Sequence, residues 1–308
     1  MYVETFKVFC DLAETGSFSK SAQLNEITQS AVSQQIRALE NRFKVILVER
    51  GRRNFSLTPE GTAFLEASRE ILEVYNHLGD RLRELRNVVA GQLRIASIYS
   101  IGLHELPPRL KAFREKHPEV EVHVEYRRSG QVYAQVIGGE VDLGIVAYPA
   151  KRAGLQIDIF DEDELVMICH PRHPLAARKR VPLKALSGER FIAFEPNLPT
   201  RKVVDRHLRE QEVQITHSME FDNIETVKRA VEIESGVSIV PSNTVKEEVS
   251  NGTLAAVHFE ATKLWRPLGV ITKRNRPRSP ALKEFLAALR GEYGLNGVRH
   301  EATAAQSR

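Results

Sequence analysis

The segment Thr28–Leu39 constrains the fold most strongly, because apolar and polar residues interleave in it at the spacing of a helix. Val32, Ile36 and Leu39 predict one apolar edge. A second edge carries hydroxyl, amide and guanidinium groups and no acid, from Ser30, Ser33, Gln34 and Arg37. Such groups can meet base edges and phosphates in a DNA major groove. Taken alone, the segment is better explained by a solvated helix face, and only its surroundings reverse that preference.

The residues before this segment favour a helix-turn-helix. An apolar stripe predicts a first helix over residues 3–14, which Gly16 ends. A short helix follows over about residues 20–24, with Ser17 or Ser19 as its N-cap, and Thr28 is the N-cap expected for the next helix. In this motif the second helix of the pair enters the groove N-terminus first. That end holds Gln29, Ser30, Ser33 and Gln34.

Basic residues gather in a turn that follows. Two strand-like runs, residues 46–49 and 55–58, flank a glycine-bearing turn with Arg50, Arg52 and Arg53. Residues 29–58 hold six basic and two acidic residues, whereas residues 1–90 hold twelve of each. The basic excess is therefore local, as expected of a nucleic-acid footprint. An ordinary solvated turn is the alternative.

A long helix is predicted next, from Thr58-Pro59-Glu60 to about Val89. Apolar residues recur in it at steps of three and four, which is typical of a heptad seam. The seam comprises Phe64, Ser68, Ile71, Tyr75, Leu78, Leu82, Leu85 and Val89. We expect a second copy of the chain to cover it, with Ile71, Tyr75, Leu78, Leu82 and Leu85 in the dimer contact. Packing onto the chain's own body is the alternative.

These features together resemble a LysR-type transcriptional regulator. The runs A-E-T-G-S-F-S-K-S-A and S-A-V-S-Q-Q-I-R-A-L-E, with R-G-R-R-N-F-S-L-T-P-E-G, match the N-terminal signature of that family over residues 1–65. The resemblance implies that the DNA groove faces Gln29, Ser30, Ser33, Gln34 and Arg37. It places Arg52 and Arg53 on a wing near phosphate or the minor groove.

Composition bounds the remaining possibilities. A chain of 308 residues exceeds one compact core, so two or three domains are expected. No signal peptide or membrane span is visible, so we expect a cytoplasmic protein without a membrane partner. Cys10 and Cys169 both lie in apolar stretches and are expected to be buried. His170 and His173 flank Pro171 without further ligands, so we expect no metal site. We also expect no catalytic residues and no cofactor, because no dense set of acids and histidines is visible.

Alternating strands and helices after Gly91 indicate an α/β body. The resemblance implies a two-subdomain fold similar to periplasmic binding proteins. The expected domains are a winged helix-turn-helix over 1–58, a linker helix over 59–90 and an effector domain over 91–295, with a disordered tail over 296–308. Within the effector domain, subdomain one comprises 91–160 and 266–295, and subdomain two comprises 161–265.

Ligands of open α/β sheets bind beyond the carboxyl ends of strands, where helices begin. Hydroxyls and backbone N–H groups at such helix starts favour a small anion, for example a carboxylate. The resemblance supports cleft positions at the strand-to-helix turns, and we expect effector contacts from Ser97, Ser100, Ile101, Ser129, Thr200 and Asn223. Plain helix capping would also explain serine and threonine at these positions.

The expected function is therefore a DNA-binding regulator switched by a small-molecule effector of unknown identity. The family implies a homodimer that assembles into a homotetramer and contacts RNA polymerase. Three alternatives remain: a thiol redox sensor on the same scaffold, an α/β enzyme fused to a DNA-binding domain, and a solute-binding protein. The sequence shows no phosphate-binding loop and no G-x-S-x-G elbow, and only Cys169 lies in the body.

Overall fold

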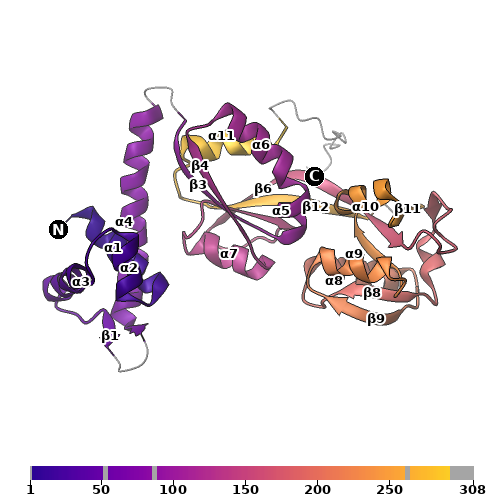
Figure 1. The fold of residues 1–308 in the computed structure, drawn as a ribbon, viewed down its shortest axis with the longest axis horizontal. Helices are drawn as coiled ribbons and strands as arrows, with labels where there is room; N and C mark the ends of the chain where they lie inside the picture. The colour runs from indigo at the N-terminus through magenta and orange to yellow at the C-terminus, as the bar shows by residue number, and fades with distance from the viewer. Residues whose placement is uncertain (1, 51–54, 85–88, 261–263, 292–308) are drawn as a thin grey trace, which may run out of the picture. The chain divides into compact units, whose positions relative to one another are not determined.

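A computed structural model describes residues 2–50, 55–84, 89–260 and 264–291 (Figure 1). The chain divides into two compact units, Met1–Val89 and Ala90–Arg308, and each is described by itself. Among the described helices, none has the combination of length and apolar character that crossing a membrane requires. The expected tail over 296–308 lies outside the described residues.

The N-terminal unit contains the predicted helix-turn-helix. Its helices are α1 (Val3–Thr15), α2 (Phe18–Leu24) and α3 (Gln29–Phe43). Gly16 ends α1 with a positive φ of 60°. The side chains of Ser17 and Thr28 accept hydrogen bonds from the N–H groups of Lys20 and Ala31, which confirms both as N-caps. Ser19 is instead inside α2.

The apolar edge of α3 is the core of this unit. Val32, Ile36 and Leu39 are at most 1% exposed and pack with Phe9 and Leu12 of α1. The period predicted from the sequence therefore places this edge inward, which leaves the polar edge outward.

The wing and the long helix are joined at Thr58. Strands β1 (Val48–Arg50) and β2 (Phe55–Leu57) pair antiparallel, and α4 covers Pro59–Glu84. The Thr58 hydroxyl donates to the carbonyl of Ile46 at 2.6 Å and accepts from the N–H of Gly61 at 2.9 Å. One side chain thus ties the start of α4 to the residues that lead into the wing.

The second unit is built on a sheet with the strand order β4-β3-β5-β12-β6-β11-β7, and β10 also pairs with β6. A separate parallel pair, β8 and β9, adjoins it through a bridge from Phe191 to Val237. The strands are β3 (Gly91–Ser97), β4 (Val120–Tyr126), β5 (Leu143–Ala147), β6 (Leu155–Cys169), β7 (Arg180–Val181), β8 (Arg190–Phe194), β9 (Thr216–Phe221), β10 (Ser238–Pro241), β11 (Ala255–Phe259) and β12 (Trp265–Lys273).

Strand β6 runs through both halves of this unit, one built on β3, β4, β5 and β12 and the other on β7, β8, β9, β10 and β11. Residues 155–164 of β6 pair with β12, and residues 165–169 pair with β10 and β11. The sequence predicted only Leu165–Cys169 as a strand. Five of the first ten residues of β6 are acidic, so this part lacks the continuous apolar run that marks the last five.

Helices cover both faces of the sheets. In the first half, α6 and α11 lie on one face and α7 on the other (Figure 1). The helices are α5 (Tyr99–His104), α6 (Leu106–Lys116), α7 (Ser129–Ile137), α8 (Pro199–Glu210), α9 (Ile224–Glu232), α10 (Lys246–Asn251) and α11 (Pro280–Leu289), with 3-10 turns η1 (Leu183–Leu186) and η2 (Ser242–Val245). The short elements β7, η1, η2 and α10 were not predicted, because too few residues reveal a period.

Candidate functional site

The polar edge of α3 is available to a partner. Gln29, Ser30, Gln34 and Arg37 are exposed, and Ser33 is half-buried. Ser30 shares a 2.9 Å hydrogen bond with the hydroxyl of the Thr28 cap, so it is held at the start of the helix. Four of the five side chains are thus exposed on one edge of the helix, as the sequence predicted from their spacing.

Glu40 positions the wing relative to α3. Its carboxylate accepts from the N–H groups of Leu47 and Val48, at 3.0 and 3.4 Å. This acid therefore orients the start of β1, although it lies within a basic stretch. Arg52 and Arg53, the arginines assigned to the wing, lie outside the described residues.

The seam of α4 changes character along the helix. Ser68 is fully buried, and the ring of Phe64 packs against Phe6 and Phe9 of α1. Further along, the apolar side chains are 41–57% exposed, at Ile71, Tyr75, Leu78 and Leu82. Leu85 lies outside the described residues. The first part of the seam thus packs on its own unit, and the second part presents an apolar surface.

A cleft of about 70 Å³ lies in the second unit where four helices begin. The N-cap residues of α5, α7, α8 and α9 all line it: Ile98, Arg128, Leu198 and Asn223. Neither Ile98 nor Leu198 caps its helix with a side chain, so the N–H groups of the first turn of α5, and those that follow Pro199 in the first turn of α8, keep their capacity to donate. Helix N-termini carry partial positive charge, so their convergence suits an anion.

The predicted effector residues divide into two groups. Ser100, Ser129, Thr200 and Asn223 line the cleft. Ser97 and Ile101 do not: Ser97 is fully buried, and its hydroxyl donates to the carbonyl of Ile98. Ile101 is 1% exposed on the inner face of α5. The strand-to-helix turn was located correctly, but only the tertiary structure shows which residues of that turn face the cleft.

Three arginines of the cleft lining were not predicted. Arg127 and Arg128 precede α7, and Arg266 lies in β12. Arg128 donates to Asp222 at 2.8 Å and lies 3.5 Å from Glu195, so it links the two halves of the unit. Its hydrogen bond lowers the pKa of Asp222. The sequence does contain one feature that could have identified Arg266, namely a charged residue inside the apolar run W-R-P-L-G-V-I.

Arg201 fixes the start of α8 beside Thr200. The Arg201 side chain is 8% exposed and bonds Asp205 and Glu220 at 2.8 and 2.7 Å. It also donates to the carbonyl of Phe194. Burial opposes the charge, but the hydrogen bonds to Glu220 and Asp205 outweigh burial and raise the pKa of Arg201. The end of β8 and the first turn of α8 are therefore held together at the cleft.

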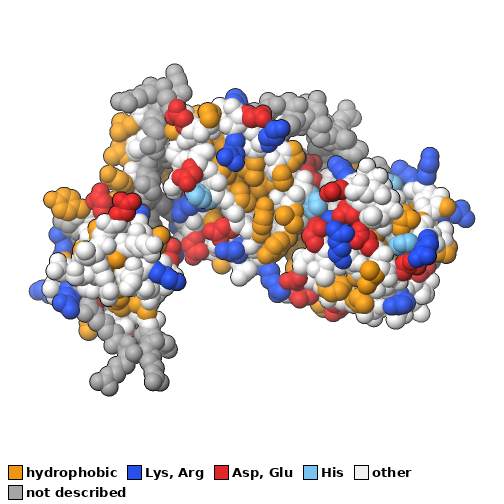
Figure 2. Space-filling model, viewed as in Figure 1, with side chains coloured by type: hydrophobic (Ala, Val, Ile, Leu, Met, Phe, Trp, Pro, Cys, Tyr) orange, Lys and Arg blue, Asp and Glu red, His pale blue; other side chains and the backbone are white. Residues whose placement is uncertain are grey.

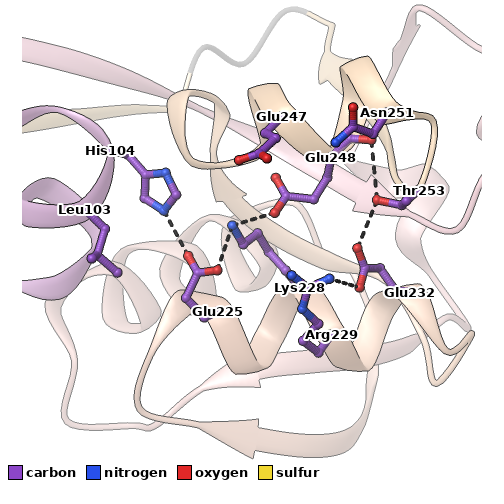
Figure 3. A pocket seen from close by; sticks show the side chains of 10 residues that line it. All are labelled: Leu103, His104, Glu225, Lys228, Arg229, Glu232, Glu247, Glu248, Asn251 and Thr253. Carbon is purple, nitrogen blue, oxygen red and sulfur yellow. Dashed lines mark hydrogen bonds and ion pairs between the residues drawn. The ribbon is translucent and has the colours of Figure 1, made fainter. Parts of the chain in front are cut away.

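A larger pocket of about 410 Å³ is lined by residues of α5, α9 and α10 (Figure 3). His104 of α5 and Glu225 of α9 meet there at 2.9 Å. The ammonium of Lys228 is 2% exposed and reaches Glu225 at 2.9 Å, Glu248 at 2.7 Å and the carbonyl of Thr244 at 3.1 Å. Figure 2 shows acidic and basic side chains side by side over α9. These charges largely pair with one another.

Both cysteines are buried, as predicted. Cys10 is 7% exposed and Cys169 is fully buried. Burial raises the pKa of the Cys10 thiol to about 12 and that of Cys169 to about 11. They lie in different units, so the described structure presents no thiol pair. Within the described ranges, no group of three His, Cys, Asp or Glu side chains is placed to hold a metal ion.

Two family models match the chain. Residues 3–62 match the model described as bacterial regulatory helix-turn-helix protein, lysR family, and residues 86–294 match the LysR substrate binding domain. Together they cover both units.

Relatives of similar length support the same grouping. The chain is 33% identical over 286 residues to "Probable RuBisCO transcriptional regulator" of Chlorokybus atmophyticus, covering 89% of this chain and 90% of that one. It is 30% identical over 281 residues to the HTH-type transcriptional activator CmpR of Synechocystis, covering 91% and 92%.

Solved structures share the fold. A full-length OxyR variant from Pseudomonas aeruginosa superposes with a TM-score of 0.78 at 21% identity, over 94% of this chain and 95% of that one. Full-length CbnR in complex with its target DNA gives 0.64 at 22% identity, over 94% and 99%. The regulatory domain of Synechocystis CcmR in complex with 2-PG gives 0.60 at 27% identity, over 66% and 97%.

Proposed function

The chain belongs to the LysR family of transcriptional regulators, and we propose that it is switched by a small anion bound in the cleft where α5, α7, α8 and α9 begin. The family comprises DNA-binding regulators and not enzymes. The convergence of four helix N-termini and three arginines on one cleft carries the proposal. The complex of the related CcmR regulatory domain with 2-PG makes 2-PG the first ligand to test.

We assign DNA reading to Gln29, Ser30, Ser33, Gln34 and Arg37 of α3, with Arg52 and Arg53 at phosphate. CbnR, which shares this fold, is known in complex with its target DNA. Each of these arginines at a phosphate would release counterions, so the DNA affinity should fall steeply with salt.

We propose that the exposed seam of α4, from Ile71 to Leu82, joins two copies of the chain. The dimers would pair again into a tetramer that works in the cytoplasm and contacts RNA polymerase on the DNA. Ligand in the cleft would shift the equilibrium between two conformations of the α/β unit. This shift would change the spacing between the helix-turn-helix units of the oligomer and the bend of the DNA.

Binding to the cleft can be tested by calorimetric titration of the full-length protein with 2-PG and with inorganic phosphate. Ser100→Ala and Thr200→Ala each remove a hydroxyl from the cleft and should weaken binding about tenfold. Lys111→Ala, an exposed change on α6, is the control and should bind as the wild type does. If neither probe binds the wild type, the proposed anion site is wrong.

DNA reading is tested separately by footprinting. Arg37→Ala should cost about 1–3 kcal/mol of specific affinity while the fold is retained, because Arg37 is exposed. A footprint and a DNA bend that stay the same across a broad metabolite screen would contradict the ligand switch and leave DNA binding intact. An affinity insensitive to salt would contradict the phosphate contacts.

The buried thiols argue against a redox sensor on this scaffold. The OxyR neighbour shares the fold at 21% identity, which says nothing of thiol chemistry here. A reactive cysteine needs an accessible thiolate, whereas burial holds the pKa of Cys169 at about 11.

A further inference from the structure

Arg266 places a buried positive charge at the cleft. It lies near the start of β12, its side chain is 2% exposed, and it lines the cleft together with Ser100 and Thr200. A charged side chain is rarely buried to this extent unless it is paired, because desolvation of the charge is costly. Its hydrogen-bond partners therefore decide what it can do.

Two of the five N–H groups of Arg266 have assigned partners. One terminal nitrogen donates to the hydroxyl of Ser100 at 2.9 Å, and the other donates to the carboxylate of Asp163 at 2.5 Å. Among the residues that the structure describes, none accepts from the buried Nε–H. The guanidinium therefore retains a donor, and one of its satisfied donors meets a hydroxyl that itself lines the cleft.

Asp163 lies on β6, which runs through both halves of the unit, and Arg266 lies on the neighbouring strand β12. They are direct partners in the antiparallel register of β6 and β12. Asp163 is 1% exposed and also accepts from the side-chain amide of Asn243, in η2, at 2.7 Å. The cluster thus joins α5 and both strands to η2. A change in the bonding of Arg266 would reach both halves of the unit.

We propose that Arg266 is an anion-binding residue of the cleft and that Asp163 is a built-in carboxylate which competes with the ligand for it. This inference rests on the proposed anion site. An arriving carboxylate or phosphate would accept from Ser100 and from the guanidinium, and Asp163 would keep the hydrogen bond from Asn243. Because the guanidinium charge is already balanced, the ligand must itself be charged to compete, so neutral analogues should be rejected.

Two substitutions with opposite expected signs test this assignment. In the full-length protein, Arg266→Met removes the charge at similar volume and should weaken binding of inorganic phosphate and 2-PG about tenfold or more. Asp163→Asn removes the competing charge and keeps an acceptor for Asn243, so it should tighten the same binding severalfold. Both changes break the buried pair, so both should lower the unfolding temperature.

The two signs separate ligand binding from a structural role. If the pair only supported the fold, both variants would weaken binding alike or leave it unchanged, and either result overturns the inference. Arg178→Met, an exposed arginine between β6 and β7, is the matched control and should bind as the wild type does.

Two further outcomes complete the test. If Arg266→Met does not fold, Arg266→Lys, which keeps the charge, should bind the probes with intermediate affinity. Asp163→Asn then still tests whether removing the competing carboxylate tightens binding. If wild type binds neither probe while the variants fold, the anion site itself fails and this inference with it. If the wild type binds a probe and the variants bind it with the same affinity, only the proposed role of Arg266 is contradicted.

Discussion

Replacing Lys228 by methionine should destabilise the second unit strongly. The substitution keeps the length of the side chain but removes an ammonium that serves three acceptors. Glu248 would remain as a carboxylate with a side chain 10% exposed and without its cation. Breaking a buried pair from one side costs about 3–5 kcal/mol. Glu225 is 40% exposed, so water can solvate its carboxylate, and losing its cation adds little to the destabilisation.

The loss of unfolding free energy in Lys228→Met should depend on pH. Burial would raise the pKa of Glu225, but hydrogen bonds from Lys228 and His104 outweigh it and lower that pKa from its ordinary value of 4.5. A lowered carboxyl pKa stabilises the fold above the ordinary value, and this contribution is lost as the pH falls through the folded-state pKa. Between pH 7 and 5 the loss in Lys228→Met should therefore stay nearly constant through Glu225, and it should shrink only as the pH falls below 4.5.

Urea unfolding followed by Trp265 fluorescence measures this difference, because the chain has one tryptophan and it lies in the second unit. Lys202→Met, an exposed change on α8, is the control and should stay within about 0.5 kcal/mol of wild type. The double variant Lys228→Met, Glu248→Gln should recover part of the loss. A loss below about 1 kcal/mol at pH 7, or one that does not shrink below pH 4.5, would refute the reasoning.

Three further predictions concern other parts of the chain. Gly61→Ala would place a Cβ 2.0 Å from the carbonyl oxygen of Leu47, a backbone atom, so the DNA-binding unit should lose about 1–3 kcal/mol in a thermal melt followed by circular dichroism; an unchanged melt would contradict this close approach. Leu78→Glu, at a side chain 56% exposed, should shift sedimentation toward monomer without changing the circular dichroism spectrum, and an unchanged oligomer would remove the seam from the dimer contact. Cys10 and Cys169 should resist iodoacetamide at pH 8 in native protein, because burial raises their pKa values to about 12 and 11; rapid labelling counted by mass spectrometry would contradict their burial.

The sequence predicted the helix-turn-helix of the N-terminal unit accurately. Val32, Ile36 and Leu39 are separated by one helical period, so their inward placement follows from local geometry, and the polar edge of α3 must then face outward. The caps Ser17 and Thr28 are equally local, since each bonds an N–H three residues further on. Features that span a few residues of one helix can be predicted because the chain itself brings them together.

The turns that follow the strands also allowed the sequence to locate the proposed anion cleft. The arginines that line this cleft were not predicted. Ser100 and Ser97 lie three residues apart in one turn, yet one lines the cleft and the other is buried. Arg266 lies 166 residues from the serine to which it donates and 103 from Asp163. Their meeting depends on the antiparallel pairing of β6 with β12, and no local period encodes that register. The sequence by itself therefore determined the helix proposed to read DNA, whereas only the tertiary structure decided which charges line the proposed anion cleft, because contacts between distant strands are set by packing of the whole sheet.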